Sequence, residues 1–356
     1  MMKQRSIILI ISCALLSTAV VIMLFFLSED MIHRNNSFLR QFPPHVITEG
    51  RTVDIEYDSY YIAGATKTEV YLGNYTSPRN VTVVNTISLD TQHVVLDIKN
   101  AQSLKIFHLI LKVDSPDFFL TDGGVPLVFE GKVNDWRATQ RHAFDSAYFI
   151  DSEPISRNSF AMRYMLSSTK EYTLGKQTQK PHHVQFASGL LQKQVDGRFC
   201  VDGMLHYDKE MRWLVYLYYY RNQYIVADTN LNLIHRGRTI DTVSHARIKV
   251  AEISRTNSRT LAAPPLIVNK MSSVSAGRIF VNSSLISKTE NKNTFDNASV
   301  IDVYNLRNRE YKFSFYIFDY KGNKIRDLQI VGDKLIVLID HYITVYGLQS
   351  YYFQKE

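Results

Sequence analysis

The sequence predicts an all-β fold, and three observations support this prediction. From about residue 52 to residue 348, short runs rich in Val, Ile, Tyr and Phe alternate with turn residues, which is typical of antiparallel strands joined by hairpins. No long apolar face of helical spacing interrupts these runs. Aromatic residues make up 12% of the chain, an enrichment that suits half-buried strands.

The last fifty residues give the clearest strand pattern. Apolar runs at residues 325–331, 335–339 and 343–346 are separated by a Gly-Asp-Lys turn and an Asp-His turn. Weaker copies of this phrase recur upstream, and together they form six units of three or four strands. The units start near residues 52, 107, 146, 203, 265 and 325. Six such units predict a β-propeller with six irregular blades; a β-sandwich or two smaller β-domains are the alternatives.

Several units depart from the common pattern. The last unit has only three strands, and we expect a strand near residues 45–48 to complete it and close the ring, which would remove exposed sheet edges. The third unit is short. Residues 284–297 are polar and predict an exposed hairpin inserted into unit five, and residues 249–260 are polar and irregular.

The N-terminus contains one segment long enough to cross a membrane. Residues 7–27 carry no charge, and about 20 apolar residues span a bilayer core of roughly 30 Å. Lys3 and Arg5 precede this segment, so the positive-inside rule predicts a single-pass membrane protein with its N-terminus in the cytoplasm and the rest of the chain outside. The alternatives are a cleaved signal peptide and a lipoprotein acylated at Cys13.

The expected division of the chain follows from this segment. Residues 1–30 form the membrane anchor, residues 31–44 a stalk that includes a Pro-Pro pair, and residues 45–356 the propeller ectodomain. Cys13 lies in the anchor, so the ectodomain has one cysteine, Cys200, and no internal disulfide. The net charge is +7, of which Lys3 and Arg5 supply two. The remaining +5 is too dilute to indicate a nucleic-acid partner.

The C-terminal phrases YIFD at residues 316–319, GDKL at 332–335 and YITVY at 342–346 resemble the blades of TolB-like and NHL-like six-bladed propellers. The front phrases DSYYIAG at 58–64 and VYLGN at 70–74, with APPL at 263–266, further resemble membrane-anchored propeller proteins of Gram-negative bacteria. The resemblance implies a propeller in the periplasm, anchored in the inner membrane by a single span, and it supplies no catalytic residues.

Four residues are candidates for a ligand or channel site. His182 and His183 are a candidate metal pair, but neighbours on a strand point to opposite faces, and a solvated loop explains them as well. Asp122 begins an Asp-Gly-Gly stretch that could bind an anion through backbone N–H groups or simply form a hairpin turn. Arg163 interrupts an apolar strand, so it faces solvent, a carboxylate or a central channel.

No catalytic cluster emerges from the remaining sequence. Asp340 and His341 lack a nucleophile elbow, and Cys200 lies in an apolar setting typical of a core residue. Tyr216, Tyr218 and Tyr220 share one strand face, which predicts burial between sheets or, less simply, an aromatic binding platform. The sequence indicates no catalytic residue, no metal site and no cofactor.

The function predicted from these patterns is a non-catalytic, membrane-tethered binding or scaffold module for a partner protein or a small ligand. The alternative is a metal-dependent hydrolase or lactonase-like propeller with its site at the central channel. A third hypothesis, a eukaryotic membrane enzyme that processes glycans, would need a nucleotide site, and the sequence shows none.

Overall fold

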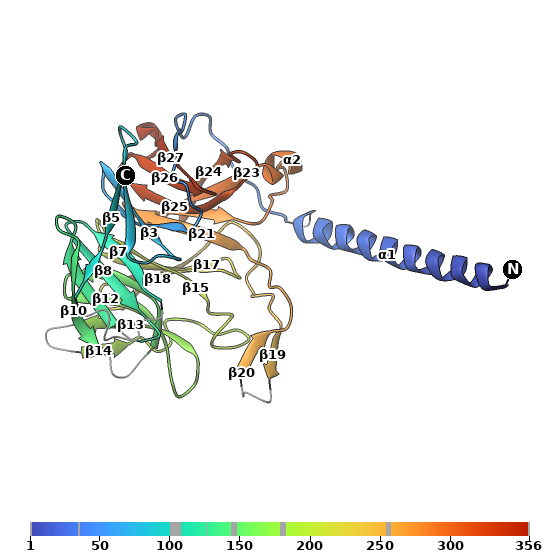
Figure 1. The fold of residues 1–356 in the computed structure, drawn as a ribbon, viewed down its shortest axis with the longest axis horizontal. Helices are drawn as coiled ribbons and strands as arrows, with labels where there is room; N and C mark the ends of the chain where they lie inside the picture. Colours follow the sequence, from blue (N-terminus) through green and yellow to red (C-terminus); the bar gives the residue numbers. More distant parts are fainter. Residues whose placement is uncertain are drawn as a thin grey trace.

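The structure, a computed structural model, describes residues 2–34, 36–99, 108–125, 127–143, 148–178, 183–253 and 258–354. These residues form six sheets of four or five strands, one two-stranded hairpin and a long N-terminal helix (Figure 1). Blades one to three consist of β2 Tyr60–Ala65, β3 Glu69–Asn74, β4 Asn80–Asn85, β5 Thr91–Val95; β7 Ile110–Asp114, β8 Asp117–Asp122, β9 Leu127–Lys132, β10 Arg137–Ala143, with β6 Asp97–Ile98 on its edge; and β11 Tyr148–Ser156, β12 Ser159–Met165, β13 Tyr172–Thr178, β14 His183–Phe186.

Blades four to six complete the ring. They consist of β15 Gly203–Asp208, β16 Trp213–Tyr218, β17 Gln223–Asp228, β18 Leu233–Arg238; β21 Asn269–Ser275, β22 Arg278–Ser283, β23 Ala298–Asn305, β24 Glu310–Phe318; and β25 Ile325–Val331, β26 Lys334–Ile339, β27 Tyr342–Gly347, β1 Arg51–Asp54. The first strands of successive blades contact one another, and β25 contacts β2. The predicted six-bladed propeller is therefore confirmed.

The ring is closed by a strand from the N-terminal side of the propeller. β1 pairs antiparallel with β27, from Arg51 opposite Val345 to Asp54 opposite Tyr342. The closing strand was expected at residues 45–48, and that position was wrong. Those residues meet only the end of β27 and the residues after it: the Thr48 N–H donates to the Gly347 carbonyl oxygen at 2.9 Å, and Ile47 forms an isolated bridge with Leu348.

Several outer strands were missed because they carry few apolar residues. Blade one has a fourth strand, β5, and blade three has a fourth strand, β14, so the third unit is not short. Both strands are largely exposed, and an exposed outer strand needs no apolar alternation. Residues in the predicted irregular stretch also form a hairpin, β19 Val250–Ile253 and β20 Ser258–Leu261.

The insertion in blade five is not an exposed hairpin. It lies between β22 and β23 as predicted, but it holds the short helix α2 Lys292–Asp296, and Leu285 and Ile286 in it are buried. Tyr216 and Tyr218 are also buried, in the core between blades three and four, while Leu217 packs on the opposite side of the strand. The predicted burial between sheets is thus confirmed for Tyr216 and Tyr218.

The N-terminal helix α1 spans Met2–Arg34. Within it, Ile7–Phe26 has a mean hydropathy of 2.9 and is unburied, so this stretch is long and apolar enough to cross a membrane. The helix leaves the propeller on the side that carries α2 and the β19–β20 hairpin (Figure 1).

Residues 36–44, which the sequence placed in a stalk, pack onto blade five. Phe38 is buried against Val243, Val268 and Leu285. The guanidinium of Arg40 donates from Nε and an Nη atom to the two carboxylate oxygens of Asp302, at 2.7 and 3.0 Å. The segment therefore follows the surface of the domain from Asn36 onward.

Candidate functional site in the central channel

The first strands of all six blades surround a central cavity of about 430 Å³. Its walls come from β2, β7, β11, β15, β21 and β25, with Tyr75 and Tyr219 contributed by loops at one end. Cavities of this size are typical of small-molecule sites. The channel is thus large enough for a ligand and too small for a folded partner.

Four of these inner strands carry a register shift near the same position. The pairing with the second strand skips one residue before Gly64 in β2, Asp151 in β11, Met271 in β21 and Asp327 in β25. Such bulges redirect side chains and are common beside functional sites. Here they bring two carboxylates, from blades three and six on opposite sides of the ring, into the cavity lining.

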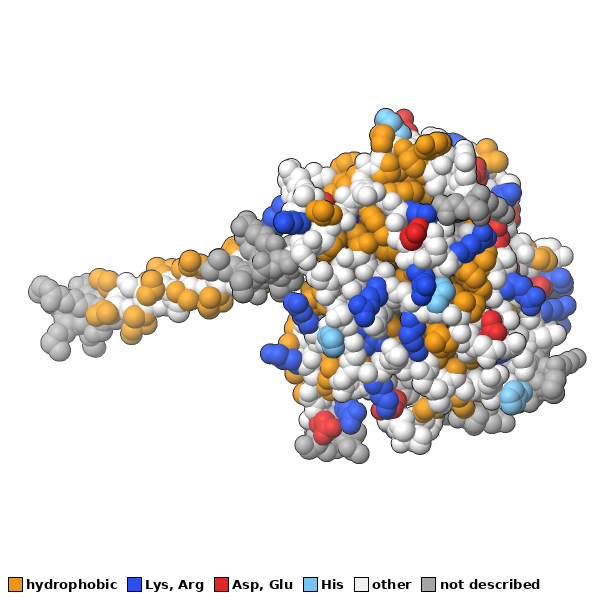
Figure 2. All heavy atoms as spheres, turned by 180° about the vertical axis from the view of Figure 1, so that it is seen from behind, with side chains coloured by type: hydrophobic (Ala, Val, Ile, Leu, Met, Phe, Trp, Pro, Cys, Tyr) orange, Lys and Arg blue, Asp and Glu red, His pale blue; other side chains and the backbone are white. Residues whose placement is uncertain are grey.

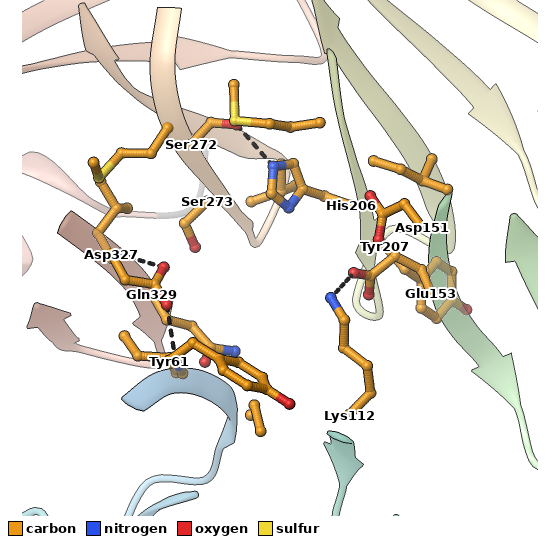
Figure 3. Close-up of a pocket in the computed structure, with 18 of the residues that line it drawn as sticks. Tyr61, Lys112, Asp151, Glu153, His206, Tyr207, Ser272, Ser273, Asp327 and Gln329 are labelled. Atoms are coloured by element: carbon orange, nitrogen blue, oxygen red, sulfur yellow. Dashed lines mark hydrogen bonds and ion pairs between the residues drawn. The ribbon is translucent and has the colours of Figure 1, made fainter. Parts of the chain in front are cut away.

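A charged pair lies in the cavity wall. Lys112 Nζ on β7 donates to Glu153 Oε1 on β11 at 2.5 Å, and the two side chains remain 28% and 17% exposed. Figure 3 shows this pair facing Tyr61 and Asp327 across open space. Lys112 has three donors, and among the described residues only Glu153 accepts from it, so it can bind a further acceptor.

Burial and charge shift the pKa values of this pair. Burial alone would lower the pKa of Lys112, but the carboxylates of Glu153 and Asp151 outweigh it and the pKa is raised. Burial raises the pKa of Glu153, and Lys112 opposes this only in part. Lys112 therefore remains cationic over the whole physiological range.

His206 on β15 is a neutral donor or acceptor in the same cavity. Its Nε2 lies 2.7 Å from Ser272 Oγ on β21 (Figure 3). Burial, together with the positive charge of Lys112, lowers the pKa of His206 to about 4. The imidazole is thus uncharged at neutral pH, and it presents one ring nitrogen to Ser272.

The two carboxylates beside the bulges, Asp151 and Asp327, differ in how many hydrogen bonds they accept. Asp327 accepts the Ile62 N–H and the Leu328 N–H, both at 2.8 Å. Asp151 accepts the Ser152 N–H at 2.9 Å through Oδ1, and its Oδ2 has no hydrogen-bond donor among the described residues. Asp151 is therefore the better placed of the two to bind a ligand.

The channel lining is charge-balanced. Four cationic side chains, those of Lys112, Lys209, Lys270 and Arg326, face four carboxylates, those of Asp114, Asp151, Glu153 and Asp327. Tyr61 adds an aromatic ring, whose centroid lies 4.4 Å from that of Tyr75 with the two planes tilted by 32°. A balanced lining favours a neutral or zwitterionic polar ligand over a polyanion.

Arg163 does not line this cavity. It lies in β12, buried to 7% exposure, where its guanidinium pairs with Asp202 and lies over the ring of Tyr172 at 5.2 Å. The sequence predicted that Arg163 faces solvent, a carboxylate or the central channel, and the structure shows that it faces a carboxylate.

Asp122 and His183 also lie away from the channel. Asp122 is buried at the end of β8, and its Oδ1 accepts the Gly124 and Val125 N–H groups at 2.9 and 3.1 Å. These two N–H groups already donate to Asp122, so they do not form the predicted anion site. His183 starts the outer strand β14 and is exposed, whereas His182 lies outside the described residues.

Sequence reasoning missed every residue of the channel that carries charge. A usable signal existed, because Lys112, Glu153 and Asp327 are charged residues inside the first strand of their blades, and Lys112 lies between the apolar Leu111 and Val113. In a propeller, such positions face the central channel. Among the described residues, no three His, Cys, Asp or Glu side chains lie close enough together to hold a metal ion.

Comparisons with solved structures find six-bladed propellers. Virginiamycin B lyase of Staphylococcus aureus, a catalytically inactive variant with quinupristin, is 10% identical with a TM-score of 0.47 over 85% of this chain and 99% of the lyase chain. A DUF4221 protein of Bacteroides vulgatus is 9% identical with a TM-score of 0.48, over 89% of this chain and 99% of the other.

A nidogen–laminin complex is 8% identical with a TM-score of 0.40, over 72% of this chain and 79% of the other. No protein-family model and no curated protein matches the sequence. Identities this low carry no information about activity. The chain is a six-bladed β-propeller preceded by one helix that is long and apolar enough to span a membrane.

Proposed function

We propose that this protein is a membrane-tethered, non-catalytic binding module whose central channel takes a small polar ligand. The observation that carries the proposal is the Lys112–Glu153 pair, which is partly open and has unused hydrogen-bonding capacity inside a closed ring of strands. The ligand would offer an acceptor to Lys112 and a donor to Asp151. Zwitterionic and polyhydroxylated molecules both meet this requirement.

The tether gives such a module a location. Residues 1–30 would anchor a single-pass protein in the inner membrane of a Gram-negative bacterium, with the TolB-like propeller in the periplasm. Confinement next to the membrane raises the effective concentration of the domain for any target there. A protein partner that presents a small polar group to the channel is compatible with this function.

The test is ligand binding by the full-length protein in detergent. Its unfolding temperature would be measured with zwitterionic amino acids, neutral sugars and tricarboxylates, since a ligand that binds only the folded state raises it. We expect a rise with a member of the first two classes and its loss in Asp151→Asn. Asp90→Asn, in an exposed turn, is the matched control. A rise that persists in Asp151→Asn, or a rise only with tricarboxylates, would rule out the proposed site.

A hydrolase acting in the same channel is the second candidate. One observation favours it: carboxylates and His206 converge on one cavity, as a general acid–base site requires. Its test is hydrolysis of lactones and esters by wild type and His206→Gln, with and without added Ca²⁺ or Zn²⁺. Turnover by wild type that falls by a factor of about 100 in the variant would support this candidate.

A further inference from the structure

Blade five carries a second cavity, separate from the one at the channel axis. Its volume is about 630 Å³. Apolar walls come from Leu266, Ile267 and Phe295, and charged walls from Arg247, Lys270 and Lys324. Phe295 belongs to α2, which lies on the side of the propeller from which α1 leaves (Figure 1).

The docked segment after α1 forms the neighbouring wall. Leu266 lines the cavity and also packs against the cluster that buries Phe38. The apolar span ends at Phe26 and the helix at Arg34, so eight residues, about 12 Å of helix, separate the bilayer core from the domain. One headgroup layer is roughly 6 Å thick, so the cavity lies within reach of the membrane surface.

The cavity has an excess of positive charge. Three cations line it against one carboxylate, Asp296, which already pairs with Lys292 at 3.2 Å. Lys324 is held by the carbonyl oxygens of Ala298 and Phe295 at 2.7 and 3.3 Å, and its Nζ lies 3.7 Å from Oδ1 of Asp319. Among the described residues, Arg247 and Lys270 have no hydrogen-bond or ion-pair partner. Burial and the charge of Lys324 lower the pKa of Lys270, and the negative charge of Asp319 opposes this only in part.

The rim of the cavity is apolar. Ile267 is 43% exposed, and Phe318, which pairs with the cavity residue Ala298, is 63% exposed. In the view from behind, Lys and Arg side chains also lie along the edge of the domain nearest the helix (Figure 2). Exposed apolar side chains beside cations are the combination found on membrane-surface elements.

We propose that this cavity binds the phosphate headgroup of an anionic phospholipid from the bilayer that α1 enters, with an acyl chain leaving over Ile267 and Phe295. The phosphate pairs with Arg247 and Lys270, which otherwise lack partners. Bound lipid holds blade five toward the membrane and fixes which face of the propeller is turned to the bilayer. The inference rests on the membrane anchor of the proposed function but not on a ligand in the channel.

The experiment is titration of the full-length protein in detergent with phosphatidylglycerol, followed by native mass spectrometry. We expect one lipid bound per chain, and about 25-fold weaker binding by Arg247→Gln/Lys270→Gln, since each cation at an anionic lipid surface contributes about fivefold. The matched control is Lys249→Gln/Lys288→Gln, which removes two exposed cations outside the cavity. The control is expected to bind as wild type.

Three results would overturn the proposal. Equal weakening of both double variants would indicate diffuse charge attraction instead of a site. Unchanged binding by Arg247→Gln/Lys270→Gln would remove these residues from the site. Full competition by inorganic phosphate at the concentration of the lipid would indicate a site for free phosphate.

A single variant separates this proposal from the one for the channel. Lys270 also lines the channel, whereas Arg247 lines only the second cavity. Arg247→Gln is therefore expected to lose phosphatidylglycerol affinity by about fivefold while its response to channel ligands is unchanged. Melting of each variant in detergent alone checks that the fold is intact.

Discussion

Arg40 and Lys112 both pair with carboxylates across separate elements of the propeller, yet only Lys112 faces open space. Arg40 makes four hydrogen bonds, to Asp302, Glu290 and the carbonyl oxygen of Leu285, and its side chain is fully buried. Lys112 makes one bond, to Glu153, and remains 28% exposed in the cavity.

The difference separates a structural ion pair from a pair that can bind a ligand. The carboxylates beside Arg40 are also satisfied by hydroxyl groups, since Ser314 donates to Asp302 and Tyr316 donates to Glu290. Arg40 uses four of its five N–H donors within the protein and faces no open space, so this cluster holds the docked segment in place. In the channel, by contrast, two Lys112 donors and one Asp151 oxygen are available.

Arg40→Met is expected to have the largest effect on stability. The substitution leaves two carboxylates buried without their cation, and loss of one partner of a buried ion pair costs about 3–5 kcal/mol. Urea unfolding of the full-length protein in detergent measures it. Lys292→Met, at an exposed pair with Asp296, is the control and should cost under about 0.5 kcal/mol. A loss below about 1 kcal/mol in Arg40→Met would mean that the docked segment contributes little.

His206→Gln is expected to change how stability depends on pH. The folded-state pKa of His206 is about 4, below the ordinary value of about 6.5, so the folded state resists protonation and wild type loses stability as pH falls between these values. The glutamine variant lacks this loss. Relative to wild type, it should gain about 2 kcal/mol between pH 7 and pH 4.5. Parallel stability curves would show that His206 is not buried as a neutral group.

Lys112→Met should cost little stability at neutral pH, under about 1 kcal/mol, because the pair is partly solvated. Without the lysine, the already raised pKa of Glu153 rises further. A carboxyl with a raised folded-state pKa binds more protons when folded, so stability falls as pH rises above the ordinary value of about 4.3. Relative to wild type, the unfolding temperature of the variant should therefore fall between pH 5 and pH 7. Lys132→Met, at a more exposed pair with Asp117, should show no such dependence.

His183→Ala should have the smallest effect, within about 0.5 kcal/mol, as for most exposed positions. It lies on the outer strand β14, and two strands separate β14 from β11, which lines the channel. Its response to channel ligands should equal that of wild type. A lost response would place a ligand on the outer rim of blade three.

The inner and middle strands were predictable, whereas the outer strands and the site were not. Residues 325–331 and 335–339 follow a simple apolar pattern and appear as β25 and β26. β5 and β14 are exposed outer strands with little pattern to detect. The sequence analysis assigned the residues of β1 to the start of unit one. β1 instead pairs with β27, some 290 residues away in sequence, and such a distant pairing leaves no local signal.

The site escaped prediction for a related reason. Arg163 attracted attention because a cation in an apolar strand needs a partner, and its partner is Asp202 in the next blade. Lys112 and Glu153 come from different blades and meet only when the ring closes. Charge inside the first strand of a unit is the local mark that both residues share.

The most direct test compares Lys112→Met with Arg40→Met for both stability and ligand response in the same preparations. Lys112→Met is expected to lose less than about 1 kcal/mol of stability at pH 7 and to lose the ligand-induced rise in unfolding temperature. Arg40→Met is expected to be strongly destabilised and to keep the rise. If Lys112→Met retains the full rise, or if Arg40→Met alone abolishes it, the channel is not the binding site.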